Sequence, residues 1–181
     1  ASAFLVAYPQ DITHQRRTVP PLRSSVWPVY PEADGASLTR LAFVELLYDL
    51  AGRPQPGASV AFMDVEDSSA VVWAAETSIV TGNGRGSFLP LDPVDREQAA
   101  VMIYNYALRV GGAEPVAAGE ELAGLLDRMA VSAWAQPAVE FCLAGDIIPA
   151  AGTRGDLFLP ASPVTRHEAQ YFLAQVADYL E

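Results

Sequence analysis

The chain has 181 residues, of which 51% are hydrophobic, and this composition is typical of a folded globular protein and excludes wholesale disorder. Its 22 acidic residues against 11 basic ones, all arginine, give a net charge of −11 that repels nucleic acid and anionic lipid. The longest apolar runs are a few residues, so we expect no membrane insertion. The single cysteine, Cys142, excludes an intramolecular disulfide.

The first 30 residues resist a helical assignment. Prolines at positions 9, 20, 21 and 28 exclude a long helix, so we predict an extended N-terminal arm over residues 1–30, or a part of the first repeat described below. The sequence lacks the basic start and following apolar stretch of a secretory signal. We therefore expect that a signal was removed or lies outside this sequence.

Apolar residues at helical spacing predict the helices that follow in chain order. Three long helices are predicted, over residues 38–50, 96–109 and 165–180. The side chains placed to cap their first turns are those of Thr39, Asp95 and Thr165. Two shorter helices fit residues 70–77 and 132–144, and the glycine-rich loops between short and long helices are too interrupted for sheets. The sequence therefore predicts an all-α fold.

One segment recurs along the chain. Phe88-Leu89-Pro90, with Arg96 six residues after its proline, returns as Phe158-Leu159-Pro160 with Arg166 at the same spacing. A partial copy, Val29-Tyr30-Pro31, precedes Thr39-Arg40. Repetition of this kind indicates units that bury their apolar faces against one another. We expect a partial first repeat over 31–57, a second over 58–112 and a third over 113–181.

The repeated unit resembles the surface-layer homology (SLH) family. The second unit contains Phe62-Met63-Asp64-Val65, then Trp73-Ala74, Ile79-Val80-Thr81-Gly82, Gly86-Ser87-Phe88-Leu89-Pro90 and Asp95-Arg96-Glu97-Gln98. The third contains Trp134-Ala135, Gly145-Asp146-Ile147-Ile148, Phe158-Leu159-Pro160 and Val164-Thr165-Arg166-His167-Glu168. The first keeps only Leu38-Thr39-Arg40 and its helix. Five motif pieces in the same order make the resemblance specific over residues 30–181.

The resemblance implies a fold, a partner and a location. Three helix-loop-helix repeats would form a pseudo-threefold set of prongs, and the grooves between prongs would take an anionic secondary cell-wall polymer, often carrying pyruvylated sugars. The protein would then be a non-catalytic anchor, extracellular and held on a bacterial cell wall or S-layer, with no cofactor. The sequence leaves open whether further domains of a larger surface protein are attached.

The recurrent arginine is the strongest candidate for ligand contact, and the alternative is a structural arginine that pairs with an acidic neighbour such as Asp34, Glu97 or Glu168. It lies just after a helix N-cap, where unpaired backbone N–H groups and the helix dipole favour an anion. We expect the groove around Thr165, Arg166 and Glu168 to bind most strongly, because its motif is intact, whereas Asp95 competes for the Arg96 guanidinium. The full set of predicted ligand-binding residues is Thr165, Arg166, Glu168, Arg96, Gln98, Thr39, Arg40, Trp73, Gly84 and Gly86.

Aromatic residues and the glycine-rich loop carry further expectations. Phe141 and Trp134 are placed in the core because aromatics at helical spacing usually lie there, while Trp73 is expected to be partly open to a sugar. Gly84 and Gly86 are explained by positive φ angles and the close approach of a ligand or neighbouring prong. Asp64 is placed to cap the helix after it.

Catalysis and metal binding find no support in the sequence. It has no nucleophile elbow or metalloprotease helix, and the acidic residues near Asp64 lack the ligand spacing of a calcium loop. The remaining alternative to a wall-binding module is a self-associating structural surface protein with vestigial sugar grooves. Departures from the family pattern, such as Asp95 in place of threonine, keep that alternative open.

Overall fold

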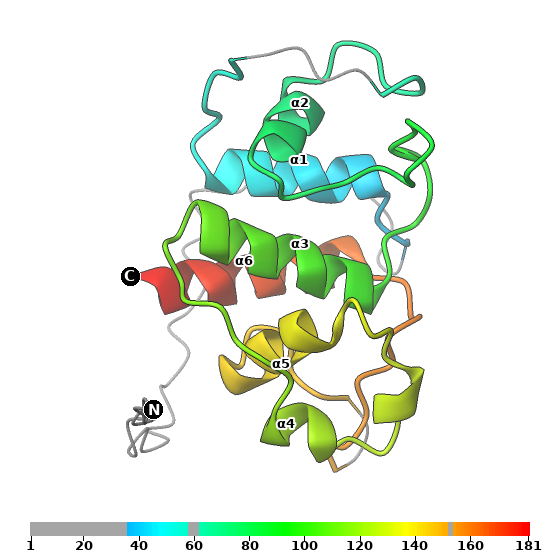
Figure 1. The fold of residues 1–181 in the computed structure, drawn as a ribbon, viewed down its shortest axis with the longest axis vertical. Coiled ribbons are helices and arrows are strands. Elements are labelled where there is room, and N and C mark those ends of the chain that lie inside the picture. The colour runs from blue at the N-terminus through cyan, green and yellow to red at the C-terminus, as the bar shows by residue number, and fades with distance from the viewer. Residues whose placement is uncertain (1–35, 58–61, 152–153) are drawn as a thin grey trace, which may run out of the picture. The chain divides into compact units, whose positions relative to one another are not determined.

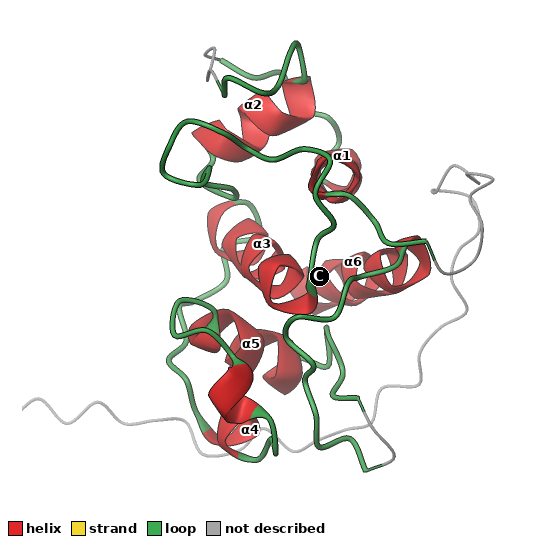
Figure 2. Ribbon diagram, turned by 90° about the vertical axis from the view of Figure 1, so that its right-hand side faces the viewer, coloured by secondary structure: helices red, strands yellow, loops and turns green. Residues whose placement is uncertain are grey.

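The computed structural model describes residues 36–57, 62–151 and 154–181. The chain divides into two units, residues 1–30 and 31–181, and all described residues belong to the second. The predicted N-terminal arm and Val29-Tyr30-Pro31 of the first repeat lie outside the described residues. Within these described ranges the elements are helices joined by loops and isolated β-bridges, without a strand (Figure 2). The prediction of an all-α fold is confirmed.

The three long helices begin at the predicted caps. They are α1 (Arg40–Leu50), α3 (Arg96–Arg109) and α6 (Arg166–Leu180). Thr39 Oγ1 accepts the N–H of Ala42 at 3.2 Å, and Asp95 accepts that of Gln98 at 2.8 Å. Thr165 and Glu168 form a reciprocal capping box. Each cap satisfies a backbone donor that the helix itself leaves without a partner.

The shorter helices differ from their predicted bounds. They are α2 (Ser69–Glu76), α4 (Glu120–Ala123), the 3-10 helix η1 (Arg128–Ala130) and α5 (Gln136–Ala144). The sequence predicted a start at Ser132 for the last of these, but residues 133–135 form a turn. Pro137 explains the delay, because proline is accommodated in the first helical turn and disfavours helical geometry further in. The sequence reasoning missed α4 and η1.

The helices of residues 36–181 pack through their apolar faces. Helix α1 packs against α2, α3 packs against α5, and α6 contacts both α1 and α3. Figure 1 shows α3 and α6 between the α1–α2 pair and the α4–α5 pair. The largest fully buried side chains come from α1, α2, α3 and α6 and from the loops between the helices: Phe43, Phe88, Phe158, Phe172, Leu47, Ile79, Ile103, Ile147, Ile148, Leu173, Val44 and Val71. Burial of this apolar surface is the main stabilising term of the fold.

A closed ring of hydrogen bonds joins the segments that precede the long helices. The N–H of Leu38 donates to the Val164 carbonyl at 2.7 Å, that of Val164 to Val94 at 2.9 Å, and that of Val94 to Leu38 at 2.9 Å. All three side chains are buried. Because each residue donates once and accepts once, the ring satisfies these backbone groups inside the core. The starts of α1, α3 and α6 are therefore fixed to one another.

Two aspartates hold the loops that lead to α3 and α6. The two carboxylate oxygens of Asp64 accept the N–H groups of Phe88 and Leu89, each at 2.8 Å. Asp127 accepts those of Phe158 at 2.9 Å and Leu159 at 2.7 Å. Leu89 and Leu159 have φ angles of +62° and +58°, which cost energy for a residue with a Cβ. The aspartates stabilise these strained turns.

The structure assigns Asp64 a different role from the predicted one. Ser68 is the N-cap of α2, and its hydroxyl accepts the N–H of Val71 at 3.3 Å. The prediction that Asp64 caps the following helix is wrong, because its carboxylate bonds a loop that is distant in sequence. Those bonds lower the pKa of the Asp64 carboxyl, chiefly through the N–H of Phe88.

Candidate functional site

Arg40, the first residue of α1, reaches into the part of the chain around α3. Its Nε donates to the Phe88 carbonyl at 3.0 Å, and Nη1 donates to Oε1 of Gln98 at 3.0 Å. The guanidinium lies 5.0 Å from the centre of the Phe88 ring. Burial lowers the pKa of Arg40, and the nearby carboxylates of Asp92, Asp95 and Asp64 oppose that shift, so the side chain stays charged.

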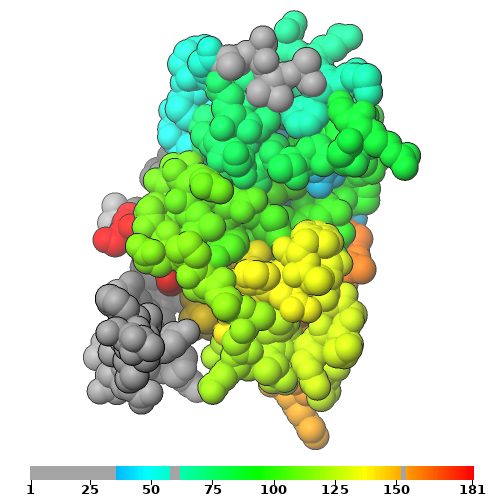
Figure 3. Space-filling model, in the orientation of Figure 1, coloured from blue at the N-terminus to red at the C-terminus, as the bar shows by residue number. Residues whose placement is uncertain are grey.

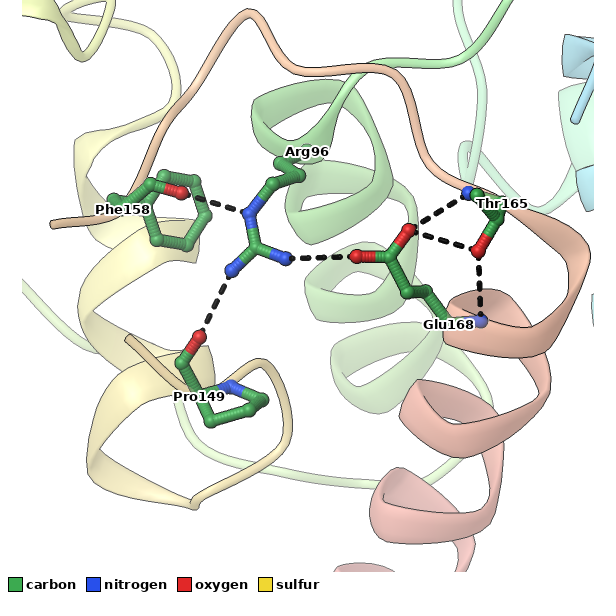
Figure 4. Close-up of polar contacts among 5 residues, drawn as sticks. All are labelled: Arg96, Pro149, Phe158, Thr165 and Glu168. Carbon is green, nitrogen blue, oxygen red and sulfur yellow. Dashed lines mark hydrogen bonds and ion pairs between the residues drawn. The ribbon is translucent and has the colours of Figure 1, made fainter. Parts of the chain in front are cut away.

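Arg96, the first residue of α3, makes a closely similar set of contacts with the segment around α6. Nε donates to the Phe158 carbonyl at 2.7 Å, and Nη2 donates to that of Pro149 at 2.8 Å. Nη1 lies 3.7 Å from Oε1 of Glu168 (Figure 4). The guanidinium also lies over the rings of Phe158 and Phe172, at 5.2 and 5.6 Å. Each of the three guanidinium nitrogens therefore has a protein partner, and only 5% of Arg96 is exposed.

The arginine and the acidic or amide residue of one motif face different neighbours. Gln98 accepts a hydrogen bond from Arg40, and Glu168 forms an ion pair with Arg96. The reason is helical geometry, because residues two apart on a helix do not share a face. Asp95 accepts the N–H of Gln98, so the expectation that it competes for the Arg96 guanidinium is wrong. Glu168 faces Arg96 with one oxygen and stays bonded to Thr165 with the other, so the groove predicted around Thr165, Arg166 and Glu168 stays a prediction.

The backbone N–H groups at the starts of α1 and α3 have protein acceptors. Arg40 donates to the Asp92 carbonyl at 2.9 Å, and Leu41 to that of Pro90 at 3.0 Å. Arg96 and Glu97 donate to the Ser162 and Pro160 carbonyls at 3.0 and 3.1 Å. The expectation that these groups are unpaired and open to an anion is therefore wrong for both helices. Any anion there must be held by side chains.

The other predicted residues at helix starts lie at the caps. Thr39 and Thr165 are the N-caps of α1 and α6, and their hydroxyls accept backbone N–H groups there. Arg166 is the half-buried first residue of α6. The assignment of Arg166 to ligand binding stays a prediction.

The two tryptophans lie in environments opposite to the predicted ones. Trp73 is 5% exposed and packs against Tyr48 with ring centres 5.4 Å apart, so its ring has no open face for a sugar. Trp134 is 59% exposed and lies in the turn before α5. The sequence reasoning placed Trp134 in the core because it started that helix too early. The signal that could have corrected this was Pro137, which delays the helix start.

The predicted loop glycines have the backbone expected of them. Gly84 and Gly86 adopt φ angles of +75° and +86°, which favour glycine. Adding a Cβ to Gly86 would place it 3.2 Å from Cε of Met63, a residue next to Asp64. The close approach at Gly86 is thus to the chain's own Met63, and a ligand-binding role for either glycine stays a prediction.

A groove brings together residues from four parts of the chain. It has a volume of about 480 Å³, and its walls include Arg40 of α1, Gln98 of α3 and Trp134 before α5. The loop after α2 contributes Thr81, Gly82, Asn83, Phe88 and Leu89, and the apolar floor includes Ile79, Val80, Val101 and Met102. In Figure 3 a small blue area of α1 is visible between green surfaces, above the yellow segment that precedes and begins α5. Among the described residues that line the groove, Arg40 is the only charged one.

Two of the three amide side chains in the described lining of the groove use their oxygen as an acceptor, whereas Asn105 donates its NH₂ to the Ile79 carbonyl at 3.1 Å. Gln98 Oε1 accepts from Arg40, and Asn83 Oδ1 accepts the N–H groups of Arg85 and Ser87 at 2.9 and 3.2 Å. The NH₂ groups of Gln98 and Asn83 therefore remain available as donors to a ligand. Within the described part of the chain, Arg40 uses two of the five N–H donors of a guanidinium. A cation surrounded by such donors is suited to a carboxylate or a hydroxyl-rich ligand.

The family comparison falls on this part of the chain. The family model of the S-layer homology domain matches residues 62–100, which include Asp64, the loop that it holds and the first turn of α3. The chain contains an S-layer homology domain. No curated protein sequence matches the chain.

The S-layer homology domain bears on location and role. Domains of this kind generally anchor proteins to cell-wall polymers and are typically non-catalytic binding modules. The chain is therefore a cell-surface or cell-wall associated protein, and the domain supports an anchoring role at the cell envelope. Among the residues that the structure describes, no helix has both the length and the apolar character needed to cross a membrane.

Proposed function

We propose that this protein is a non-catalytic module that anchors itself, or a larger surface protein, to a bacterial cell envelope. Its partner is an anionic secondary cell-wall polysaccharide that carries pyruvylated sugars, and it binds extracellularly, at the cell wall or S-layer. The observation that carries the proposal is the groove of Arg40, Gln98 and Trp134, whose only charge is positive although the whole chain is acidic. Neither a cofactor nor a metal is needed for this recognition.

The groove chemistry matches a pyruvyl ketal on a sugar. Its carboxylate would accept charge-assisted hydrogen bonds from the free N–H groups of Arg40 and from the NH₂ of Gln98. The exposed indole of Trp134 offers a flat apolar face and an N–H donor, which suit the apolar face and hydroxyls of a sugar ring. Binding of this kind depends on one cation, so it should weaken with salt and should not require calcium.

The boundaries proposed for the repeats are 31–57, 58–112 and 113–181. They are supported by the two similar arginine contacts, of Arg40 with Phe88 and Arg96 with Phe158, and by the matching aspartate contacts of Asp64 and Asp127. The hydrogen-bond ring that joins the starts of α1, α3 and α6 supports three units arranged about one axis. In this proposal, residues 1–30 are an arm or the start of the first unit.

Self-association is the second candidate function. Exposed large apolar side chains favour it, since such residues on a surface often mark protein contacts: Met63, Leu91, Leu126 and Met129. In that case the protein would assemble through its helical body, and the groove would have no ligand.

Sedimentation with purified wall sacculi, before and after removal of their secondary polymer, distinguishes the two functions. We expect the protein to pellet only with unstripped sacculi and Arg40→Ala to stay in the supernatant. Arg109→Ala is the matched control, because Arg109 is an exposed arginine at the far end of α3. Concentration-dependent oligomers without pelleting would support self-association, and equal pelleting with stripped sacculi would contradict the proposed polymer.

A further inference from the structure

Arg40 and Arg96, each with the residues that its guanidinium contacts, form two junctions with similar contacts but different charge. In each, the arginine Nε donates to a phenylalanine carbonyl, at 3.0 and 2.7 Å, and the guanidinium lies over the same phenyl ring. In each, Nη1 faces the third residue of the next long helix. That residue is Gln98 opposite Arg40 and Glu168 opposite Arg96. The two junctions therefore contain a cation with an amide and a cation with a carboxylate.

The carboxylate changes what the second junction can bind. Glu168 Oε1 lies 3.7 Å from Nη1 of Arg96, and its other oxygen accepts from both the N–H and the hydroxyl of Thr165 at 2.9 Å. The Arg96 side chain is 7% exposed and has a further bond to Pro149. Its charge is thus neutralised and enclosed, so this arginine is a structural residue.

The amide leaves the first junction open. Gln98 accepts one N–H of Arg40 without neutralising it, and Arg40 lines the groove with free donors. The acidic groups whose charges reach Arg40 lie outside the groove lining, and two of them are engaged elsewhere, Asp64 with the loop and Asp95 with the start of α3. An external carboxylate can therefore take the place that Glu168 occupies at the other junction.

We propose that Gln98 is a specificity-determining residue that reserves Arg40 for an external carboxylate, and that of these two junctions only the Arg40 one binds an anion. This inference rests on the proposed function for the identity of the ligand. The role of Gln98 itself is inferred from a comparison within the chain. At the equivalent position, the charged Glu168 pairs with Arg96 and neutralises it.

The test exchanges the two side chains at these positions. We expect Gln98→Glu to weaken binding of a pyruvylated disaccharide about ten- to a hundredfold in titration calorimetry, because the new carboxylate pairs with Arg40. Its melting temperature should not fall, since the Arg40 contact is kept. Glu168→Gln should lower the melting temperature and add no second anion site, because Arg96 stays enclosed and bonded to the Phe158 and Pro149 carbonyls. Gln98→Glu should weaken binding less in the Arg40→Ala background than in the wild type, because no guanidinium remains for the new carboxylate to neutralise.

A second measurement separates this inference from the proposed function. Sodium pyruvate is titrated into the labelled protein while the Nε–H resonances of Arg40 and Arg96 are followed by NMR. We expect the Arg40 resonance to shift in the wild type but not in Gln98→Glu, and the Arg96 resonance to stay in place. A response of Arg40 without disaccharide binding would refute the proposed polymer alone. Unchanged disaccharide binding in Gln98→Glu, or an equal or absent response of both arginines to pyruvate, would overturn the role of Gln98.

Discussion

The backbone N–H of Leu38, just before α1, donates to the carbonyl of Val164, just before α6, at 2.7 Å. This bond connects the start of the described chain to its last long helix, and Val94 completes the ring with both. The segment that matches the S-layer homology model, residues 62–100, contains only one member of this ring. Its fold therefore depends on residues on either side.

Removing residues 113–181 should abolish cooperative folding. The deletion takes away α5 and α6, and it exposes the face of α3 that carries the fully buried Ile103. At about 25 cal/mol per Å² of apolar surface, the lost contact is comparable with the total stability of a domain. We expect an aggregated or molten product by calorimetry and size-exclusion chromatography. A soluble monomer with a sharp melting transition would contradict this prediction.

Arg96→Ala should destabilise the protein strongly. The change removes the charged donor of the Phe158 and Pro149 carbonyls and leaves Glu168 without its cation. We expect the free energy of unfolding to fall by about 3 kcal/mol, measured by urea denaturation. Arg109→Ala, at an exposed site on the same helix, should cost about 0.5 kcal/mol or less. Equal effects of the two variants would show that the buried contacts of Arg96 contribute little.

Arg40→Ala should weaken binding of a pyruvylated disaccharide about ten- to a hundredfold, which corresponds to the loss of a charge-assisted contact worth roughly 1.5 to 3 kcal/mol. The motif alone predicts that Arg166 contributes most to binding, because its capping box is intact. The groove instead indicates Arg40, because it is the only charged residue in the described lining. Calorimetry on Arg40→Ala and Arg166→Ala decides between these orders. A larger loss of binding affinity in Arg166→Ala would place the main site at the start of α6.

Local signals in the sequence predicted the helices but not their partners. Thr39, Asp95 and Thr165 were recognised as caps because a cap depends on residues within one turn. The pairing of Arg96 with Glu168 could not be predicted, because it depends on how α3 and α6 lie together. Helical spacing does indicate that an arginine and the residue two positions later face apart, and this rule alone separates Arg96 from Gln98.

The environment of aromatic residues was the least predictable feature of the site. Trp73 and Trp134 both precede an alanine near a short helix, and their motifs do not distinguish a core ring from an exposed one. The difference arises from tertiary packing, in which Trp73 meets Tyr48 of α1 and Trp134 lies in a turn ahead of its helix. The lining of the groove could not be predicted, since four separate segments contribute to it.

The same contrast predicts opposite phenotypes for the two tryptophans. Trp134→Ala should change the free energy of unfolding by about 0.5 kcal/mol or less, as expected at an exposed site, while weakening saccharide binding. Trp73→Ala should cost about 3–5 kcal/mol, because it empties a buried aromatic site. Urea denaturation and calorimetry measure both effects. Strong destabilisation by Trp134→Ala would contradict its placement outside the core.

Acid should weaken the contribution of Asp64 to stability. Its bond from the Phe88 N–H lowers the pKa of the Asp64 carboxyl below the ordinary value of 3.8. In the folded state it therefore stays ionised at a pH where the unfolded chain already binds a proton. Its stabilising effect is complete above the unfolded pKa and is lost as the pH falls through the lower, folded pKa.

Asp64→Asn should accordingly lower the melting temperature at neutral pH, and the gap to the wild type should shrink on acidification. The variant cannot ionise, and its amide has one acceptor oxygen where the carboxylate has two, so one of the N–H groups of Phe88 and Leu89 loses its acceptor. Melting curves recorded from about pH 7 to about pH 2 measure the gap. Asp67→Asn, at an exposed residue of the same loop, is the matched control and should melt close to the wild type at neutral pH. A gap that stays constant over this range would show that the charge of Asp64 does not stabilise the turn before α3.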